Sequence, residues 1–117
     1  MLIRTRRVYE PPSPADGVRV LVDRLWPRGL AKSSARLDCW AKPCAVSHEL
    51  RRWYQHDPEK WEEFRRRYYA ELDANPAGVA ELLEHVGSGP VTLLYGSKEA
   101  ERNNATALRE YLQERVG

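Results

Sequence analysis

One short segment gathers most of the side chains that could do chemistry in this chain. Residues 23–29, with the sequence DRLWPRG, follow directly on an apolar run. Guanidinium groups bind carboxylates and phosphates through paired hydrogen bonds, and an indole ring can stack on a base or a sugar. We therefore predict a binding edge in which Arg24 and Arg28 hold an anion and Trp26 covers a ring. Asp23 is the best candidate for an acid or a base.

The same segment also admits a purely structural interpretation. Asp23 could form an ion pair with one of the two arginines and only fix the loop, without any catalysis. Trp26 could likewise fill the edge of the hydrophobic core instead of contacting a ligand. The sequence leaves both interpretations open.

A second loop, Tyr95-Gly96-Ser97-Lys98-Glu99, has an anion-binding character of its own. Gly96 permits close approach of a ligand to the backbone, and Ser97 is a natural N-cap for a following helix with free N–H groups. Lys98 adds a full positive charge, although it could equally lie in solvent beside a simple helix cap. We expect one of Asn103 and Asn104, about one turn into that helix, to face inward, where it would brace the loop or contact a ligand.

These loops need elements to position them, and the apolar pattern supplies a strand before each. Residues 18–22 and 91–95 are apolar runs bounded by turn signals, which is typical of buried central strands. Weaker patterns predict short strands within residues 2–9 and 35–40. Capping residues and helical apolar spacing predict helices at 47–55, after Asp57-Pro58, from Asn75-Pro76 to Gly87, and at the C-terminal end.

Strands alternating with helices predict an α/β protein. We expect a single three-layer domain over residues 1–117, with a small, mainly parallel sheet flanked by helices in a Rossmann-like arrangement. Ligands of such sheets bind beyond the carboxyl ends of the strands. If strands 18–22 and 91–95 are neighbours, the two loops therefore line one crevice.

Composition limits the classes of function. The 117 residues carry a net charge of only +2, although most of the 19 basic residues are arginine. No apolar run is long enough to span a membrane, and the first residues have charges where a signal peptide needs an apolar core, so we expect a cytoplasmic protein without membrane contact. Cys39 and Cys44 are expected to be reduced thiols, and their spacing does not predict a metal site. No cofactor is indicated.

Several blocks of the sequence together resemble the DUF488 family, in its YeaO-like branch. The blocks are DRLWPRG at 23–29, SHELRRW at 47–53, WEEFRRRY at 61–68, LLY at 93–95 and Asn103. The resemblance extends from Val8 to Leu112, implies an α/β fold in a prokaryotic protein and leaves the activity open. It implies that the pocket residues are Asp23, Arg24, Trp26, Arg28, Tyr95, Lys98 and Asn103.

The chain departs from the family pattern just before Asn103. Many members have a histidine at the position where this chain has Arg102. A mechanism that needs this histidine as a general base is therefore in doubt here.

Three hypotheses remain open. In the first, the protein binds, and could act on, a small molecule that carries phosphate or carboxylate. In the second, the protein binds or modifies nucleic acid, and arginines interleaved with aromatic residues, as in Arg65-Arg66-Arg67-Tyr68-Tyr69, would contact single strands. In the third, the domain is not catalytic and binds a protein partner, for instance a second copy through the aromatic helix face.

Overall fold

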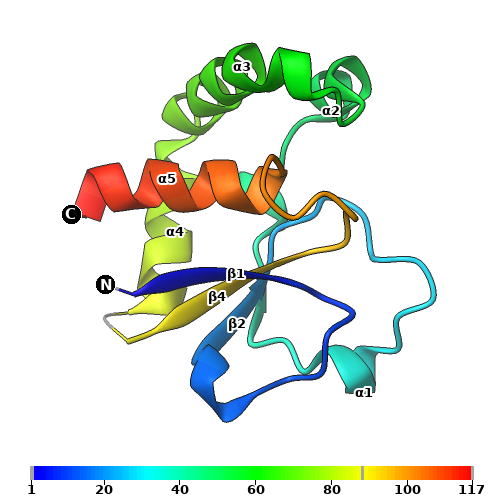
Figure 1. Ribbon diagram of the computed structural model, residues 1–117. Helices are drawn as coiled ribbons and strands as arrows, with labels where there is room; N and C mark the ends of the chain where they lie inside the picture. The colour runs from blue at the N-terminus through cyan, green and yellow to red at the C-terminus, as the bar shows by residue number, and fades with distance from the viewer. Residues whose placement is uncertain (1, 88, 117) are drawn as a thin grey trace.

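The computed structural model describes residues 2–87 and 89–116 (Figure 1). Four strands form one sheet: β1 (Ile3–Arg7), β2 (Val18–Leu21), β3 (Cys39–Trp40) and β4 (Val91–Tyr95). All neighbours pair in parallel, in the order β1-β4-β2-β3. The two apolar runs are therefore the two central strands, and they are hydrogen-bonded to each other, with Val18 opposite Val91 and Leu21 opposite Leu94.

The described residues also contain five α-helices and three short 3-10 helices. The α-helices are α1 (Lys32–Ala35), α2 (His48–Tyr54), α3 (Trp61–Asp73), α4 (Pro76–Val86) and α5 (Asn104–Val116). The 3-10 helices are η1 (Pro14–Asp16), η2 (Lys42–Cys44) and η3 (Pro58–Lys60). The expected caps are present: the side chain of Ser47 accepts from Leu50 N at the start of α2, and that of Asn75 accepts from Gly78 N at the start of α4.

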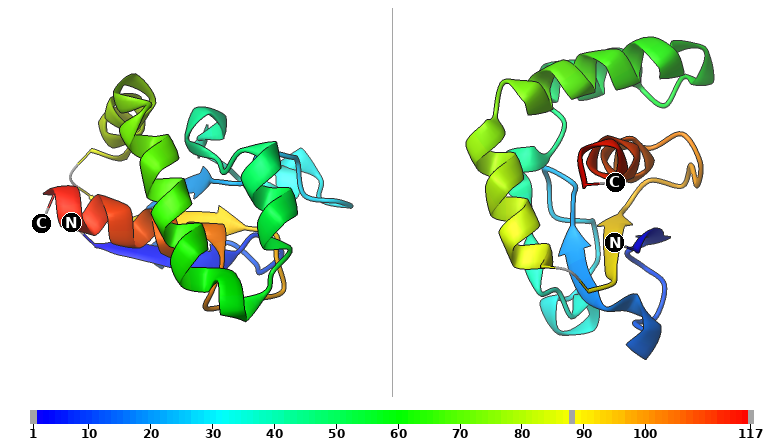
Figure 2. Two further views of the ribbon diagram at one scale, coloured as in Figure 1. Left: turned by 90° about the horizontal axis from the view of Figure 1, so that it is seen from above. Right: turned by 90° about the vertical axis from the view of Figure 1, so that its left-hand side faces the viewer.

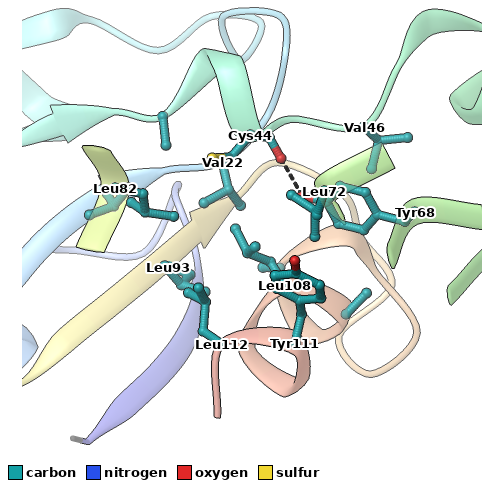
Figure 3. Packing of buried hydrophobic residues seen from close by; sticks show 14 of the residues in the cluster. Val22, Cys44, Val46, Tyr68, Leu72, Leu82, Leu93, Leu108, Tyr111 and Leu112 are labelled. Carbon is teal, nitrogen blue, oxygen red and sulfur yellow. Dashed lines mark hydrogen bonds between the residues drawn. The ribbon is translucent and has the colours of Figure 1, made fainter. Parts of the chain in front are cut away.

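The sheet lies between two unequal layers, which confirms the α/β class. Helices α4 and α5 cover one face, with α2 and α3 lying further out beyond α5, and side chains of these helices join those of β2 and β4 in one core (Figures 2 and 3). The opposite face is covered by η1, α1 and the loops beside them, around a smaller cluster built on Val8, Leu21 and Leu94. The aromatic stripe of α3 lies in the larger core, since Phe64 and Tyr68 are buried.

Two expectations about the C-terminal segment are wrong. Ser97 does not cap a helix, because α5 begins at Asn104, seven residues later. The side chain of Ser97 instead accepts from Glu99 N, 3.0 Å away, in a loop. Asn103 lies before the helix and not inside it: its Oδ1 accepts from Thr106 N at 2.9 Å and so caps α5. The residues between Ser97 and Asn103 make local turns that compete with a helix.

Helix α1, in the connection between β2 and β3, was not predicted from the sequence. None of the helices in residues 2–87 and 89–116 is long and apolar enough to cross a membrane.

Candidate functional site

A cavity of about 330 Å³ lies at the carboxyl ends of β2 and β4. We call it the β2/β4 cavity. The residues that line it are Tyr9, Asp23, Arg24, Leu25, Trp26, Pro27, Arg28, Val46, Arg51, Tyr54, His56, Phe64, Gly96, Ser97, Asn103 and Asn104. The loops after β2 and β4 therefore share one crevice, as expected for neighbouring strands.

Asp23 connects the two loops across the floor of the cavity. Its Oδ2 accepts from Gly96 N and its Oδ1 from Asn104 Nδ2, each at 2.8 Å. A Cβ on Gly96 would lie 3.0 Å from Oδ2, so a side chain at this position would have to displace the carboxylate slightly. No ion pair of Asp23 occurs within the described part of the chain, so the side chain is fixed by neutral donors and not by one of the two arginines.

Burial raises the pKa of Asp23 above the ordinary value of an aspartate. The hydrogen bonds from Asn104 and Gly96, and the charges of Arg51 and His56, offset only part of this effect. Asp23 is thus a half-buried carboxyl whose position is fixed and whose charge is only partly compensated.

Arg24 braces the chain that leads into α2. Its guanidinium donates to the carbonyl oxygens of Val46, at 2.9 Å, and Ala45, at 3.2 Å. These bonds fix the segment directly before Ser47, the N-cap of α2, and so help to position that helix. Two of the five N–H donors of Arg24 are used in this way, and the side chain still lines the cavity.

Arg28 and Arg51 reach the cavity from two directions, the first from the loop after β2 and the second from α2. Both are exposed, and neither side chain makes a hydrogen bond or ion pair with any residue in 2–87 or 89–116. Only the backbone oxygen of Arg28 is engaged, by the hydroxyl of Tyr9 at 2.7 Å. Two guanidinium groups thus border the cavity without a carboxylate partner.

His56 enters the cavity because the chain turns sharply after α2. Gln55 and His56 both have left-handed backbones, with φ of 46° and 57°, a conformation that non-glycine residues adopt at a cost. The turn places His56 Nδ1 3.5 Å from Ser97 Oγ. Arg7 fixes the other side of this contact, because its Nε donates to the carbonyl oxygen of Ser97 at 3.1 Å.

The remaining predicted site residues are divided between cavity and core. Trp26 lines the cavity, but its Nε1 donates to Leu30 O at 2.7 Å and its ring packs edge-on against Trp40, so it also closes the smaller core. Asn103 lines the cavity and is 1% exposed, and its Nδ2 braces the loop by donating to Glu99 O.

Tyr95 and Lys98 do not line the cavity in the described structure. Tyr95 is buried among core residues, and its pKa is raised by that burial. Lys98 is exposed. The side chain of Arg102 is also absent from the lining residues, and its carbonyl oxygen accepts from the hydroxyl of Tyr54.

Sequence reasoning missed Arg51, His56 and Tyr9 as cavity residues, and it expected only one of Asn103 and Asn104 there, whereas both line the cavity. Arg51 belongs to the block at 47–53 that carries the family resemblance, and this was an available signal. Asn104 was considered together with Asn103, but side-chain direction depends on where α5 begins. The position of His56 depends on two left-handed residues, which no apolar pattern indicates.

A second depression lies between α2 and α3, with a volume of about 560 Å³. Its lining contains two arginines, Arg24 and Arg67, and two glutamates, Glu49 and Glu71, so the charges are equal in number. Glu71 accepts hydrogen bonds from Ser47. The cationic excess is therefore a property of the β2/β4 cavity. In the described residues, no group of three His, Cys, Asp or Glu side chains is placed to hold a metal ion.

Comparisons with known proteins identify the family of the chain. The sequence model described as the inactive DUF488-N3 subclade matches residues 2–117. An uncharacterised protein of Mycobacterium tuberculosis is 43% identical over 113 residues, 97% of this chain and 95% of that protein. The uncharacterised protein YeaO of Escherichia coli is 39% identical over 113 residues, 97% of this chain and 98% of its own length. No solved structure matches. The chain belongs to the DUF488 family, in the subclade described as inactive DUF488-N3.

Proposed function

We infer that the protein binds an anionic small molecule, with a phosphate or carboxylate group, in the β2/β4 cavity. The observation that carries this inference is the pair Arg28 and Arg51, two guanidinium groups that border one cavity with no carboxylate partner in the described structure. An arginine without a partner at a concave site is well suited to bind a carboxylate or phosphate through paired hydrogen bonds. The cavity volume is also within the usual range for small ligands.

Binding without catalysis is the form of this function that the site supports best. Asp23 is the acid–base candidate, but both of its oxygens are engaged by donors that fix its position. The family description as inactive also favours a binding site over a catalytic one.

The nucleic-acid hypothesis has weaker support. Arg65, Arg66 and Arg67 all form ion pairs with glutamates, two of them with Glu63. A helix whose arginines are neutralised in this way offers little free charge to a phosphate backbone.

The partner-binding hypothesis named the aromatic face of α3, but Phe64 and Tyr68 on that face lie in the core. These two side chains are therefore not available to a second copy.

The test is thermal unfolding in rising concentrations of inorganic phosphate at constant ionic strength. A ligand at one hundred times its dissociation constant adds about 2.7 kcal/mol of stability, which corresponds to a rise in Tm of about 10 °C for a domain of this size. We expect the rise for the wild type and its loss in the double variant R28A/R51A.

The matched control is R52A/R66A, which removes the same number of charges from exposed positions outside the cavity. This control should retain the wild-type rise. Equal responses of the two double variants, or no response of the wild type to phosphate and to a panel of di- and tricarboxylates, would contradict the proposed function.

A further inference from the structure

The floor of the β2/β4 cavity is a hydrogen-bond acceptor, in contrast to its cationic rim. Each oxygen of Asp23 accepts one hydrogen bond, from Gly96 N or from Asn104 Nδ2. A carboxylate has about four acceptor positions, so acceptor capacity remains on a side chain that lines the cavity. Hydrogen bonds to ionised groups are the stronger ones, and a ligand donor placed there would gain from this.

A simple anion cannot use both parts of the cavity. Its charge is attracted by Arg28 and Arg51 but is repelled by Asp23, because like charges at short range oppose each other. A ligand that fills the cavity therefore has two ends, of which one is anionic and the other carries hydrogen-bond donors without negative charge.

At Asp23, hydroxyl groups on a ligand suit the cavity better than an ammonium group does. Positive charge already lies near Asp23, because the charge of Arg51 acts on its carboxyl and Arg24 lines the same cavity. A further cation would be repelled by both arginines. A neutral hydroxyl donates to the carboxylate without this repulsion.

Apolar side chains in the lining of the cavity suit a carbon skeleton. Tyr9 and Leu25 are among the few large apolar side chains of the described structure that remain exposed, at 39% and 50%, and both line this cavity. The ring of Tyr9 is held in place by its hydroxyl, which donates to Arg28 O, and by the guanidinium of Arg7, 4.7 Å from the ring centroid. A ligand body covering these side chains would remove their apolar surface from water.

We propose that the ligand is a phosphate monoester that carries hydroxyl groups, with its phosphate at Arg28 and Arg51 and a hydroxyl on the Asp23 carboxylate. This inference rests on the proposed function and specifies its ligand. Free sugar phosphates and nucleoside monophosphates share this chemistry.

The experiment is isothermal titration calorimetry of the wild-type protein with inorganic phosphate, ribose, ribose 5-phosphate, adenosine monophosphate and O-phosphoethanolamine. Ribose 5-phosphate should bind at least tenfold more tightly than phosphate, and ribose alone should bind more weakly than either. Adenosine monophosphate binding more tightly than ribose 5-phosphate would support the proposal with a nucleotide as the source, and the reverse order would support it with a free sugar phosphate.

The D23N variant tests the role of the floor. The preference for ribose 5-phosphate over phosphate should fall below about threefold, while phosphate itself binds as well as before or better, because a repelling charge is gone. The R52A variant is the control and should keep the full preference. The wild-type series remains decisive if D23N does not fold.

The failures are distinguishable. Equal affinity for phosphate and ribose 5-phosphate in the wild type would overturn this inference and leave the proposed function intact. Tighter binding of O-phosphoethanolamine than of ribose 5-phosphate would overturn the choice of hydroxyl over ammonium. Binding of no phosphate compound would overturn the proposed function itself.

Discussion

Two aspartates that flank β2, the buried Asp16 before it and the half-buried Asp23 after it, differ in the partners that surround them. Asp16, in η1, is 2% exposed and pairs with Arg6 at 2.8 Å and with the buried Arg19. Asp23, at the β2/β4 cavity, is held by the N–H of Gly96 and the amide of Asn104, and no arginine in the described structure pairs with it.

The pKa values of the two carboxyls move in opposite directions. Burial raises the pKa of Asp16, but the hydrogen bonds from Ser13 N, Arg6 and Arg19 outweigh it, so the net shift is downward. Burial also raises the pKa of Asp23, and its weaker partners do not reverse the shift. The paired charges around Asp16 stabilise the fold, whereas the charges at the β2/β4 cavity that have no partner remain available to a ligand.

The largest expected effect is that of D16N on stability. The substitution leaves Arg19 buried without its carboxylate, and breaking a buried pair in this way costs about 3–5 kcal/mol. Urea unfolding of the variant would measure the loss.

The control for D16N is E63Q, which makes the same chemical change at a carboxylate that also pairs with two arginines, Arg66 and Arg67, but on the exposed side of α3. Exposed pairs contribute little, so its loss should be much smaller. Similar losses of stability in D16N and E63Q would show that the buried ion pairs of Asp16 contribute no more than exposed ones.

The second largest effect concerns the pH dependence of stability, to which the two aspartates contribute with opposite signs. The folded pKa of Asp16 lies below its unfolded value, about 3.9. Its contribution is therefore present above that pH and is lost as the pH falls through the folded pKa. The folded pKa of Asp23 lies above the unfolded value, so its contribution is greatest below about pH 3.9 and is lost as the pH rises through the folded pKa.

Denaturation of the wild type, D16N and D23N between about pH 2 and 6 would test these signs, in the range around the ordinary aspartate pKa of about 3.9. On acidification, the advantage of the wild type over D16N should shrink, while its stability relative to D23N should rise. The changes should be smaller than the total loss in D16N at neutral pH, because only the proton-linked part varies. Slopes of the same sign would contradict the contrast between the two carboxyls.

The parts of this contrast that sequence could predict are local. Apolar runs and turn signals identified both central strands, and Ser47, Asn75 and Gly87 marked helix boundaries, because caps and periodicity act over a few residues. The crevice followed once β2 and β4 were found to be neighbours.

The failures come from long-range partners. Whether Asp23 pairs with an arginine depends on Gly96 and Asn104, more than 70 residues away. The position of α5 was misjudged because Ser97 and Asn103 are both good caps and only the second one is used. The pairing of Asp16 was not predicted, since nothing local in the sequence indicates that Arg6 and Arg19 converge on it.

The smallest expected effect is the change in stability on removing Arg28 or Arg51, which we compare with the removal of Arg24. R28A and R51A each remove an exposed side chain without a partner in the described structure, so the free energy of unfolding should change by no more than about 0.5 kcal/mol. R24A is the comparison at the same cavity, because it removes the bonds to the carbonyl oxygens of Ala45 and Val46 and should cost about 1–3 kcal/mol.

Urea unfolding of these three variants without ligand, and again in saturating phosphate, separates the two roles. The loss in R24A should be present in both conditions, since the bracing of α2 does not need a ligand. The losses in R28A and R51A should emerge only with phosphate, because only the liganded protein uses these guanidinium groups. A ligand-free loss in R28A or R51A as large as that in R24A would mean that these arginines support the fold, and the division between paired and available charges would not hold.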